Sequence, residues 1–375
     1  MNGSRVVRAV LVWLALGLVA WVLTPTVRFF VTALLGGALI GLLGEPQWPR
    51  FRRSVALAAG FGLVWGAGRP GAVPMLLAHP GLLGALLGLG ALADLALHPA
   101  EDDAVTLGAF GIPGFVLGVA LTLGSGALNR PETKDAILLQ ADRALGGLPS
   151  YAMGGAFAAH PALAAFSWVA YVMLAVEAAL VVLVAIRRGL PDMHPRRILF
   201  ACGAAGLAAL LGYWACPGTG PRYAFPGFPA ARPGPLALAG IAVSPEFPRN
   251  AMPSLHFAWA LMLHRAAFPV RWLRYMTLAW LAGIGAATLG TGEHYLIDLV
   301  VAVPFAAAIE TGLVRSWQRM LAASALTAAW VVFLGNDGGL PPALAWPAVA
   351  GTLALGVWAL PRAPYGAPQT LAQAA

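Results

Sequence analysis

Two short motifs in the second half of the chain each place a histidine at the start of an apolar segment. Residues 252–256 read MPSLH and residues 292–298 read GEHYLID, and a long apolar run follows each of them. An ionisable side chain in such a setting is costly in free energy and usually serves a function. The two histidines are therefore the first candidates for chemistry.

His294 and Asp298 have the spacing of a hydrogen-bonded pair on a helix. Residues four apart lie on the same helical face, so the Asp298 carboxylate can bind one ring nitrogen of His294 and leave the other nitrogen free. An imidazole that is oriented in this way is a good nucleophile. A local pair without a catalytic role is the simpler interpretation of this spacing when it stands alone.

His256 lies close to a predicted helix start that could bind phosphate. Proline favours the first helical position, so the sequence predicts a helix from Pro253 onward. The free backbone N–H groups of that turn attract anions, and Ser254 adds a hydroxyl donor. Arg222, in a preceding loop rich in Gly and Pro, can hold phosphate oxygens through two parallel hydrogen bonds. Taken singly, Arg222 is equally explained as a side chain that reaches the membrane interface.

The composition indicates a polytopic membrane protein. Hydrophobic residues make up 59% of the 375 residues, charged residues make up 10%, and the mean hydropathy is +0.77. Such a chain has too few polar residues to cover a water-facing surface. The net charge of +8 arises from basic residues spread along the chain, all of them arginine except Lys134. We interpret this charge as a topology signal and expect no nucleic-acid partner.

The apolar stretches predict an all-α bundle of about twelve membrane spans. Several of them are short or broken by Gly and Pro. We place the spans at residues 6–23, 29–43, 54–66, 73–97, 104–123, 165–186, 198–215, 253–268, 272–289, 295–313, 320–334 and 343–360. The first span resembles a signal peptide, but it lacks a clear cleavage site, so we expect it to remain as a helix.

Arginines in the connections predict the side of the membrane on which each loop lies. If Arg5 and Arg8 are cytoplasmic, the later arginine-rich connections fall on the same side, as the positive-inside rule requires. Both termini are then cytoplasmic, whereas Arg222 and both histidine motifs face the extracytoplasmic side of a cell membrane. The use of arginine in place of lysine, with abundant Ala and Gly, suggests a GC-rich bacterial gene.

Three polar segments should share the extracytoplasmic face, and the last of them is the turn at residues 288–293 that leads into His294. Residues 129–161 carry apolar positions at helical spacing with polar residues between them, which predicts an amphipathic helix at the membrane interface. Residues 216–250 form a long loop, and loops of this length are usually functional or mobile. The other histidines and the two cysteines lack metal-ligand spacing, so we expect no metal and no cofactor.

The two histidine motifs resemble the second and third signatures of the type-2 phosphatidic acid phosphatase superfamily. Residues 253–256 (PSLH) look like the second signature, and residues 294–298 (HYLID) look like the end of the third, with two predicted membrane helices separating them. Within the superfamily the chain is most similar to the aureobasidin-resistance type of inositolphosphotransferase. Residues 134–146 also resemble a helix that precedes the core in that branch.

This resemblance implies a phosphatidic-acid-phosphatase-type helical core and a metal-independent transfer in two steps. His294, oriented by Asp298, would attack phosphorus to form a phosphohistidine, and His256 would protonate the departing alkoxide. Arg222, Ser254 and backbone N–H groups would stabilise the phosphate oxygens. The partners would be membrane lipids, a lipid-linked phosphate or phosphodiester as donor, and an inositol-like polyol, a glycan or water as acceptor.

The chain also departs from the phosphatase pattern. Ala215 stands where the pattern expects lysine, Tyr223 replaces the proline that follows the first arginine, and residues 287–288 replace Ser-Arg. The cationic clamp is therefore thinner, which favours a phosphodiester donor because a diester carries one fewer negative charge. Further candidates for the site are Tyr223, Arg249, Lys134 and Arg130.

These observations divide the chain into four parts. They are N-terminal membrane helices outside the family core (1–128), the interfacial helix (129–161), the catalytic core (162–316), and C-terminal membrane helices with a tail (317–375). A phosphotransferase is the favoured function, and a lipid phosphate phosphatase with water as acceptor is the alternative. A transporter is a more distant alternative, because broken helices with ionisable residues also mark transporters.

Overall fold

The computed structural model describes residues 130–234, 239–244, 247–362 and 365, together with scattered residues between 32 and 112. The spans predicted at 6–23, 73–97 and most of the other early ones therefore lie outside the described residues. The chain forms two compact units. One comprises Met1–Leu121, Val172–Phe200 and Gly366–Ala375, and the other comprises Thr122–Tyr171 and Ala201–Tyr365. Both histidine motifs belong to the second unit.

In the first unit, the described contacts gather around α10 (Leu174–Arg188). The Thr32 hydroxyl donates a hydrogen bond to the Val172 carbonyl at 3.0 Å, just before this helix begins. Gly36 lies so close to α10 that an added Cβ would meet the Ala175 carbonyl oxygen at 2.7 Å. The helix ends at Gly189, whose φ of +56° is a conformation that glycine adopts without strain.

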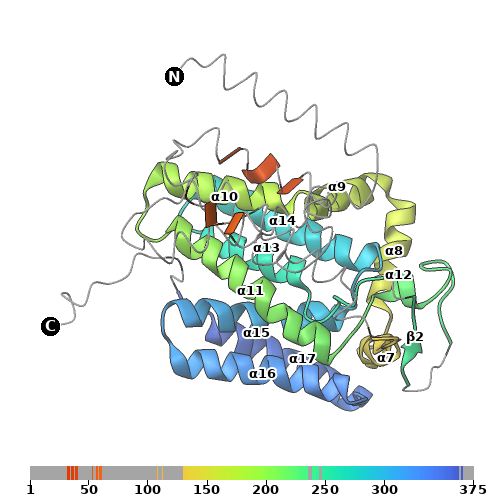
Figure 1. The fold of residues 1–375 in the computed structure, drawn as a ribbon. Coiled ribbons are helices and arrows are strands. Elements are labelled where there is room, and N and C mark those ends of the chain that lie inside the picture. The colour runs from red at the N-terminus through yellow and green to blue at the C-terminus, as the bar shows by residue number, and fades with distance from the viewer. Residues whose placement is uncertain are drawn as a thin grey trace. The chain divides into compact units, whose positions relative to one another are not determined.

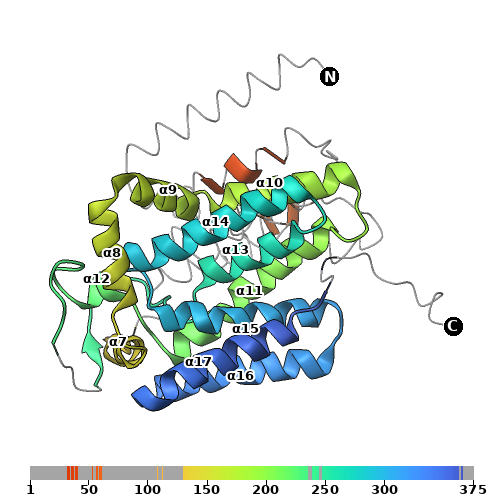
Figure 2. The same ribbon diagram turned by 180° about the vertical axis from the view of Figure 1, so that it is seen from behind.

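The described residues of the second unit form helices and one short antiparallel pair of strands, β1 (Glu132–Thr133) and β2 (Ile241–Ala242). Figures 1 and 2 show its helices from two sides. They are α7 (Asp135–Ala144), α8 (Pro149–Ala159), α9 (Pro161–Val172), α11 (Pro195–Ala215), α12 (Pro221–Ala224), α13 (Leu255–Ala266), α14 (Arg271–Gly290), α15 (Leu296–Leu313), α16 (Trp317–Gly335) and α17 (Pro342–Ala359). The described residues thus agree with the predicted all-α class.

Helix α15 is the centre of the second unit. It packs against α13, α16, α17 and α7, and Figures 1 and 2 show α15 to α17 side by side. Of its apolar stretch, 72% is buried, whereas the corresponding share is 22% for α16 and 28% for α17. The outer helices instead expose large apolar side chains, as helices in contact with lipid do. Among these are Trp317, Leu321, Val332, Leu344, Trp346, Leu355, Val357 and Trp358.

Four described helices are long and apolar enough to cross a membrane, namely α11, α15, α16 and α17. The pair α8 and α9, bent by 118°, adds a fifth if it is one broken span. Helix α13 has 12 residues, or about 18 Å at the usual rise, which is short of a bilayer core. The predicted span at 165–186 is interrupted at Met173, where α9 gives way to α10. The predicted number of about twelve spans is therefore not confirmed.

The connections of the second unit alternate between two ends. The α13–α14 and α15–α16 turns lie at one end, and that end carries Arg271, Arg274 and Arg315. The α14–α15 turn, which contains His294, lies at the opposite end. The arginine-rich turns are thus separated from the histidine motifs by the length of α14, whose 20 residues span about 30 Å.

A buried ion pair joins the ends of α13 and α15 on the arginine-rich side. Arg265 Nε donates to Glu310 Oε2 at 2.6 Å, and the Tyr365 hydroxyl donates to Glu310 Oε1 at 2.9 Å. Glu310 is fully buried. A carboxylate in this position is stable only while its donors remain in place.

We expect Glu310→Ala to lower the free energy of unfolding by about 3 kcal/mol, because it leaves the Arg265 charge buried without its partner. The double variant Arg265→Ala/Glu310→Ala should lose less than the sum of the two single variants, since neither charge is then left alone. Thermal unfolding in detergent measures both effects. Additive losses would show that the pair does not couple the two helices.

Candidate active site

The His294 imidazole is held by one of its two ring nitrogens. Nδ1 lies 2.9 Å from the Ala251 carbonyl oxygen and 3.4 Å from Asp298 Oδ2. A carbonyl oxygen can only accept a hydrogen bond, so Nδ1 carries the proton and Nε2 keeps its lone pair. The geometry therefore leaves Nε2 as the ring nitrogen without either of these contacts, while Nδ1 has a backbone carbonyl as its nearer acceptor and Asp298 as the second.

Asp298 links His294 to the start of α15. Its Oδ2 accepts the backbone N–H of Tyr295 at 2.8 Å, which caps the helix. Its Oδ1 is buried and has no hydrogen-bond partner within the described part of the chain. His294 itself is fixed through its backbone, because its carbonyl accepts the Ser150 hydroxyl of α8 at 2.8 Å.

The start of α13 lies beside the start of α15. The Ser254 backbone N–H donates to the Asp298 carbonyl at 3.3 Å. The helix begins at Leu255, so Pro253 lies before it and not at its first position, where the sequence had predicted it; the Met252–Pro253 peptide bond is cis. Ser254 is the N-cap, but its hydroxyl makes no capping bond. That hydroxyl is fully buried and unpartnered among the described residues.

The His256 ring, in the first turn of α13, lies next to two aromatic side chains. Its ring stacks on Tyr171 of α9 with 4.2 Å between centroids, and Trp259 approaches it edge-on at 6.3 Å. Ala251, five residues before His256, supplies the carbonyl oxygen that lies 2.9 Å from His294 Nδ1. The two sequence motifs therefore meet at one place, on adjacent helix starts.

Arg222 belongs to a loop that lies on the turn before His294. Its backbone N–H donates to the Gly292 carbonyl at 3.0 Å. Its guanidinium is 3.8 Å from Glu293, and the Tyr223 hydroxyl donates to the same carboxylate oxygen at 2.9 Å. The Arg222 side chain is 55% exposed, whereas that of Glu293 is 16% exposed. A cation, a phenol and a carboxylate therefore share the rim of the site.

Three predicted cations make other contacts. Arg249 is fully buried and donates to four backbone carbonyls, those of Arg130, Val243, Ser244 and Phe247. Lys134 pairs with Asp337 at 2.6 Å, and the Arg130 guanidinium lies 4.9 Å from the Trp214 ring centroid. The structure thus brings together His256, His294, Asp298, Ser254, Arg222 and Tyr223, and it engages these three cations elsewhere.

Sequence reasoning missed Glu293, although it stands directly before the nucleophile candidate. Burial raises the pKa of its carboxyl, while Tyr223, His294 and Arg222 act in the opposite direction.

The segment 129–161 also differs from the single interfacial helix that we predicted. It contains β1, α7 and α8, and α7 buries Asp135 and Asp142 instead of turning them to water. In the described part of the chain, no three His, Cys, Asp or Glu side chains gather as metal ligands.

Gly220 fits its position only because it lacks a side chain. Its φ is +94°, and an added Cβ would lie 2.3 Å from the Glu293 carbonyl oxygen. We expect Gly220→Ala to lower the free energy of unfolding by about 2 kcal/mol, through backbone strain and the clash. Gly155→Ala in α8 is the matched control, since nothing lies within 4 Å of its added Cβ. Equal melting temperatures for the two variants would contradict the close approach.

Comparison with known proteins gives one match. No curated protein and no solved structure matches the chain. A family model described as the PAP2 superfamily matches residues 136–311, which include Arg222, both histidines and Asp298. Nothing in this match is specific to the inositolphosphotransferase branch. The segment that holds the assembled site is therefore similar to the PAP2 superfamily, whose members are phosphatases or phosphotransferases.

Proposed function

We propose that the protein is a membrane enzyme that moves a phosphoryl or phospho-head group from a lipid phosphate or phosphodiester through a phosphohistidine at His294. One observation carries this proposal. Nδ1 of His294 is committed to the Ala251 carbonyl, so Nε2 is free to attack, beside a second histidine. The PAP2 superfamily match over the same residues supports a phosphatase or phosphotransferase activity.

The reaction uses His256 as the proton donor and then as the acceptor. Nε2 of His294 forms a bond to phosphorus, the bond from phosphorus to the leaving oxygen breaks, and His256 protonates that oxygen. In the second step the acceptor hydroxyl attacks phosphorus, the N–P bond breaks, and His256 takes the hydroxyl proton. Stacking on Tyr171 holds the His256 ring in place for both transfers.

Three donors are available to the phosphate oxygens. The Ser254 hydroxyl is buried and unpartnered among the described residues, which is costly unless a ligand satisfies it. The first turn of α13 offers backbone N–H groups that no side chain caps. Arg222 adds a positive charge at the rim. Together they stabilise the charge on the equatorial oxygens during transfer.

Glu293 favours a phosphodiester donor. Its carboxylate stands 3.8 Å from the Arg222 guanidinium and offsets much of that positive charge. A monoester dianion needs more positive charge than this rim supplies, whereas a diester monoanion does not. A diester donor favours transfer to an alcohol such as an inositol-like polyol or a glycan. Hydrolysis of a lipid phosphate by water is the alternative.

The extracytoplasmic side of the membrane is the proposed location of the site. The arginine-rich turns of the second unit lie at the opposite end from His294, and such turns face the cytoplasm in most membrane proteins. A transporter is disfavoured, because transporters bind their substrates near the bilayer midplane. Here the candidate site residues His256, His294 and Asp298 gather at one end of the helices.

Replacing His294 should abolish turnover. With a fluorescent lipid phosphate or phosphodiester we expect His294→Ala to lose about a thousandfold or more in kcat, because no covalent intermediate can form. A phosphorus-labelled donor should leave acid-labile label on the wild-type protein and none on the variant. Adding inositol then separates transfer from hydrolysis, because the label moves either to the polyol or to the product of hydrolysis, which is free phosphate from a monoester donor and a phosphomonoester from a diester donor.

Two further variants sharpen this test. His160→Gln changes an exposed histidine and should keep full activity. His256→Gln should slow the release of a lipid alkoxide far more than that of 4-nitrophenolate, which leaves without a proton. Label that remains on the His294→Ala protein would contradict the proposed nucleophile.

Glu293→Gln should change donor preference. We expect the ratio of kcat/KM for a phosphomonoester to that for a phosphodiester to rise about threefold or more at pH 8, because one repelling charge is removed. Glu293→Asp keeps the charge and Tyr223→Phe removes only a hydrogen bond, so neither should raise the ratio. A ratio that is equal in wild type and Glu293→Gln would remove the carboxylate from donor selection.

A further inference from the structure

Helix α7 carries two buried carboxylates on one face. Asp135 and Asp142 are seven residues apart, which is two helical turns, and both are fully or almost fully buried. Carboxylates are rarely buried unless hydrogen-bond donors meet them. Both do meet donors, and those donors lie on the segments that carry the proposed catalytic groups.

Asp142 holds the first turn of α15. Its Oδ2 accepts the Leu296 N–H at 2.9 Å, and its Oδ1 accepts the Ile297 N–H at 3.1 Å. These are the first two residues of the helix that follows His294, and their N–H groups have no partner inside the helix. The positive end of α15 is thus occupied by a carboxylate of the protein itself.

Asp135 holds the loop that leads to Arg222. It accepts the backbone N–H groups of Thr219 and Gly220, and also the Thr219 hydroxyl at 2.9 Å. The same carboxylate accepts the Tyr295 hydroxyl at 2.8 Å. One side chain therefore joins the Arg222 loop to the residue directly after His294.

We propose that Asp135 and Asp142 are positioning residues, which fix the Arg222 loop and the His294 turn against each other for phosphoryl transfer. This inference rests on the proposed function. Occupation of the α15 N-terminus by Asp142 also means that α13 supplies the backbone N–H groups for substrate phosphate. A shift of the His294 turn by about 1 Å would cost a large part of the rate.

Burying the ionised Asp142 carboxylate costs free energy, and its proposed positioning role explains why it is present. Burial raises the pKa of the Asp142 carboxyl to about 7, and the nearby Asp298 carboxylate raises it further, while the two N–H donors lower it. Because the folded pKa lies above the ordinary value, folding loses stability as pH rises through about 7. The two N–H donors offset this cost, because an apolar residue at this position would leave the Leu296 and Ile297 N–H groups without their partner.

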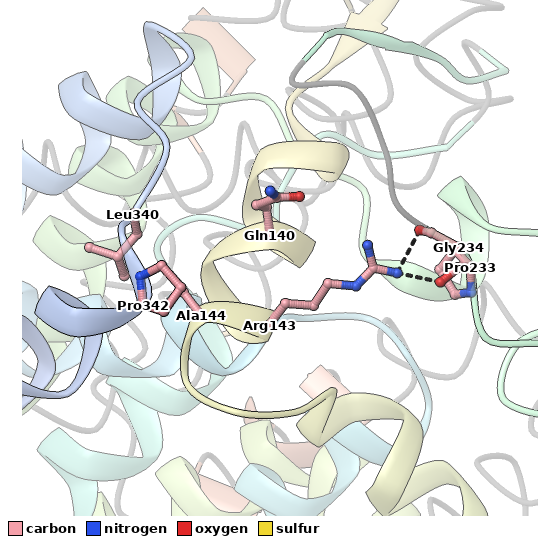
Figure 3. A pocket seen from close by; sticks show the side chains of 7 residues that line it. All are labelled: Gln140, Arg143, Ala144, Pro233, Gly234, Leu340 and Pro342. Atoms are coloured by element: carbon pink, nitrogen blue, oxygen red, sulfur yellow. Dashed lines mark hydrogen bonds between the residues drawn. The ribbon is translucent and has the colours of Figure 1, made fainter.

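The opposite side of α7 provides a matched control. Gln140, Arg143 and Ala144 line a cavity of about 440 Å³ together with Pro233, Gly234, Leu340 and Pro342 (Figure 3). Arg143 donates to the Pro233 and Gly234 carbonyls there. The described hydrogen bonds from α7 side chains to the start of α15 come from Asp142 and not from Gln140. Gln140→Ala thus changes the same helix without touching the two carboxylates.

Four variants of the whole chain, purified in detergent, test the proposal. They are Asp142→Asn, Asp135→Asn, Asp142→Glu and Gln140→Ala. We expect each Asn variant to lower kcat about tenfold or more per folded molecule, with KM changed less than kcat. Asp142→Glu should recover part of the rate. Gln140→Ala should stay within about twofold of wild type. Amide exchange at Leu296 and Ile297 should become faster in Asp142→Asn.

Two results would overturn the proposal. One is a loss of kcat in the Asn variants that follows the loss of folded protein, and the other is unchanged amide exchange at Leu296 and Ile297 in Asp142→Asn. A wild-type protein that forms no phosphohistidine with any lipid phosphate or phosphodiester would contradict the proposed function instead. The exchange measurement needs no substrate, so it distinguishes the two failures.

Discussion

The start of α15 depends on the balance between buried carboxylates and backbone N–H groups. Asp298 accepts the N–H of Tyr295, and Asp142 accepts the next two N–H groups along the chain. Each partner would be costly to bury alone, since an unsatisfied helix end and an unpaired carboxylate both lose their hydration. When the carboxylates and the N–H groups pair with each other, they fix the turn that carries His294.

The fixed start of α15 determines where the neighbouring segments of the second unit lie. Because the α15 start is fixed by α7, the α13 start can dock against it through Ser254, and the Arg222 loop can close over Gly292. Helix α15 packs against α13, α16 and α17, and close van der Waals packing is one of the forces that hold membrane helices together, since lipid is as apolar as their side chains. The polar contacts decide where the helices start, and the apolar contacts hold them side by side.

The positions of the long helices were predictable from the sequence. The spans expected at 295–313 and 343–360 appear as Leu296–Leu313 and Pro342–Ala359, because long apolar runs between polar turns leave few alternatives. The meeting of the two histidine motifs was also predictable, since positive charges in the turns assigned them to one side.

Other features left no readable signal in the sequence. Every residue has a carbonyl group, so nothing marks Ala251 as the nearer acceptor for His294. Asp135 and Asp142 alternate with apolar residues as water-facing residues do, and only tertiary contacts reveal that they point inward. Arg249 looks like a free cation, but it donates to three carbonyls of its own loop and to the carbonyl of Arg130, and local sequence does not encode that geometry.

Arg222 and His294 differ in their exposure to solvent, so the two parts of the proposed reaction take place in different environments. The arginine side chain is more than half exposed, whereas His294 is almost completely buried. At physiological ionic strength, dissolved salt screens the interaction of exposed charges that are more than about 8 Å apart, and it screens buried charges much less. In the proposed reaction, ionic strength would therefore act on the capture of an anionic lipid by the rim, whereas the step at phosphorus would take place in surroundings that the ions of the medium do not enter.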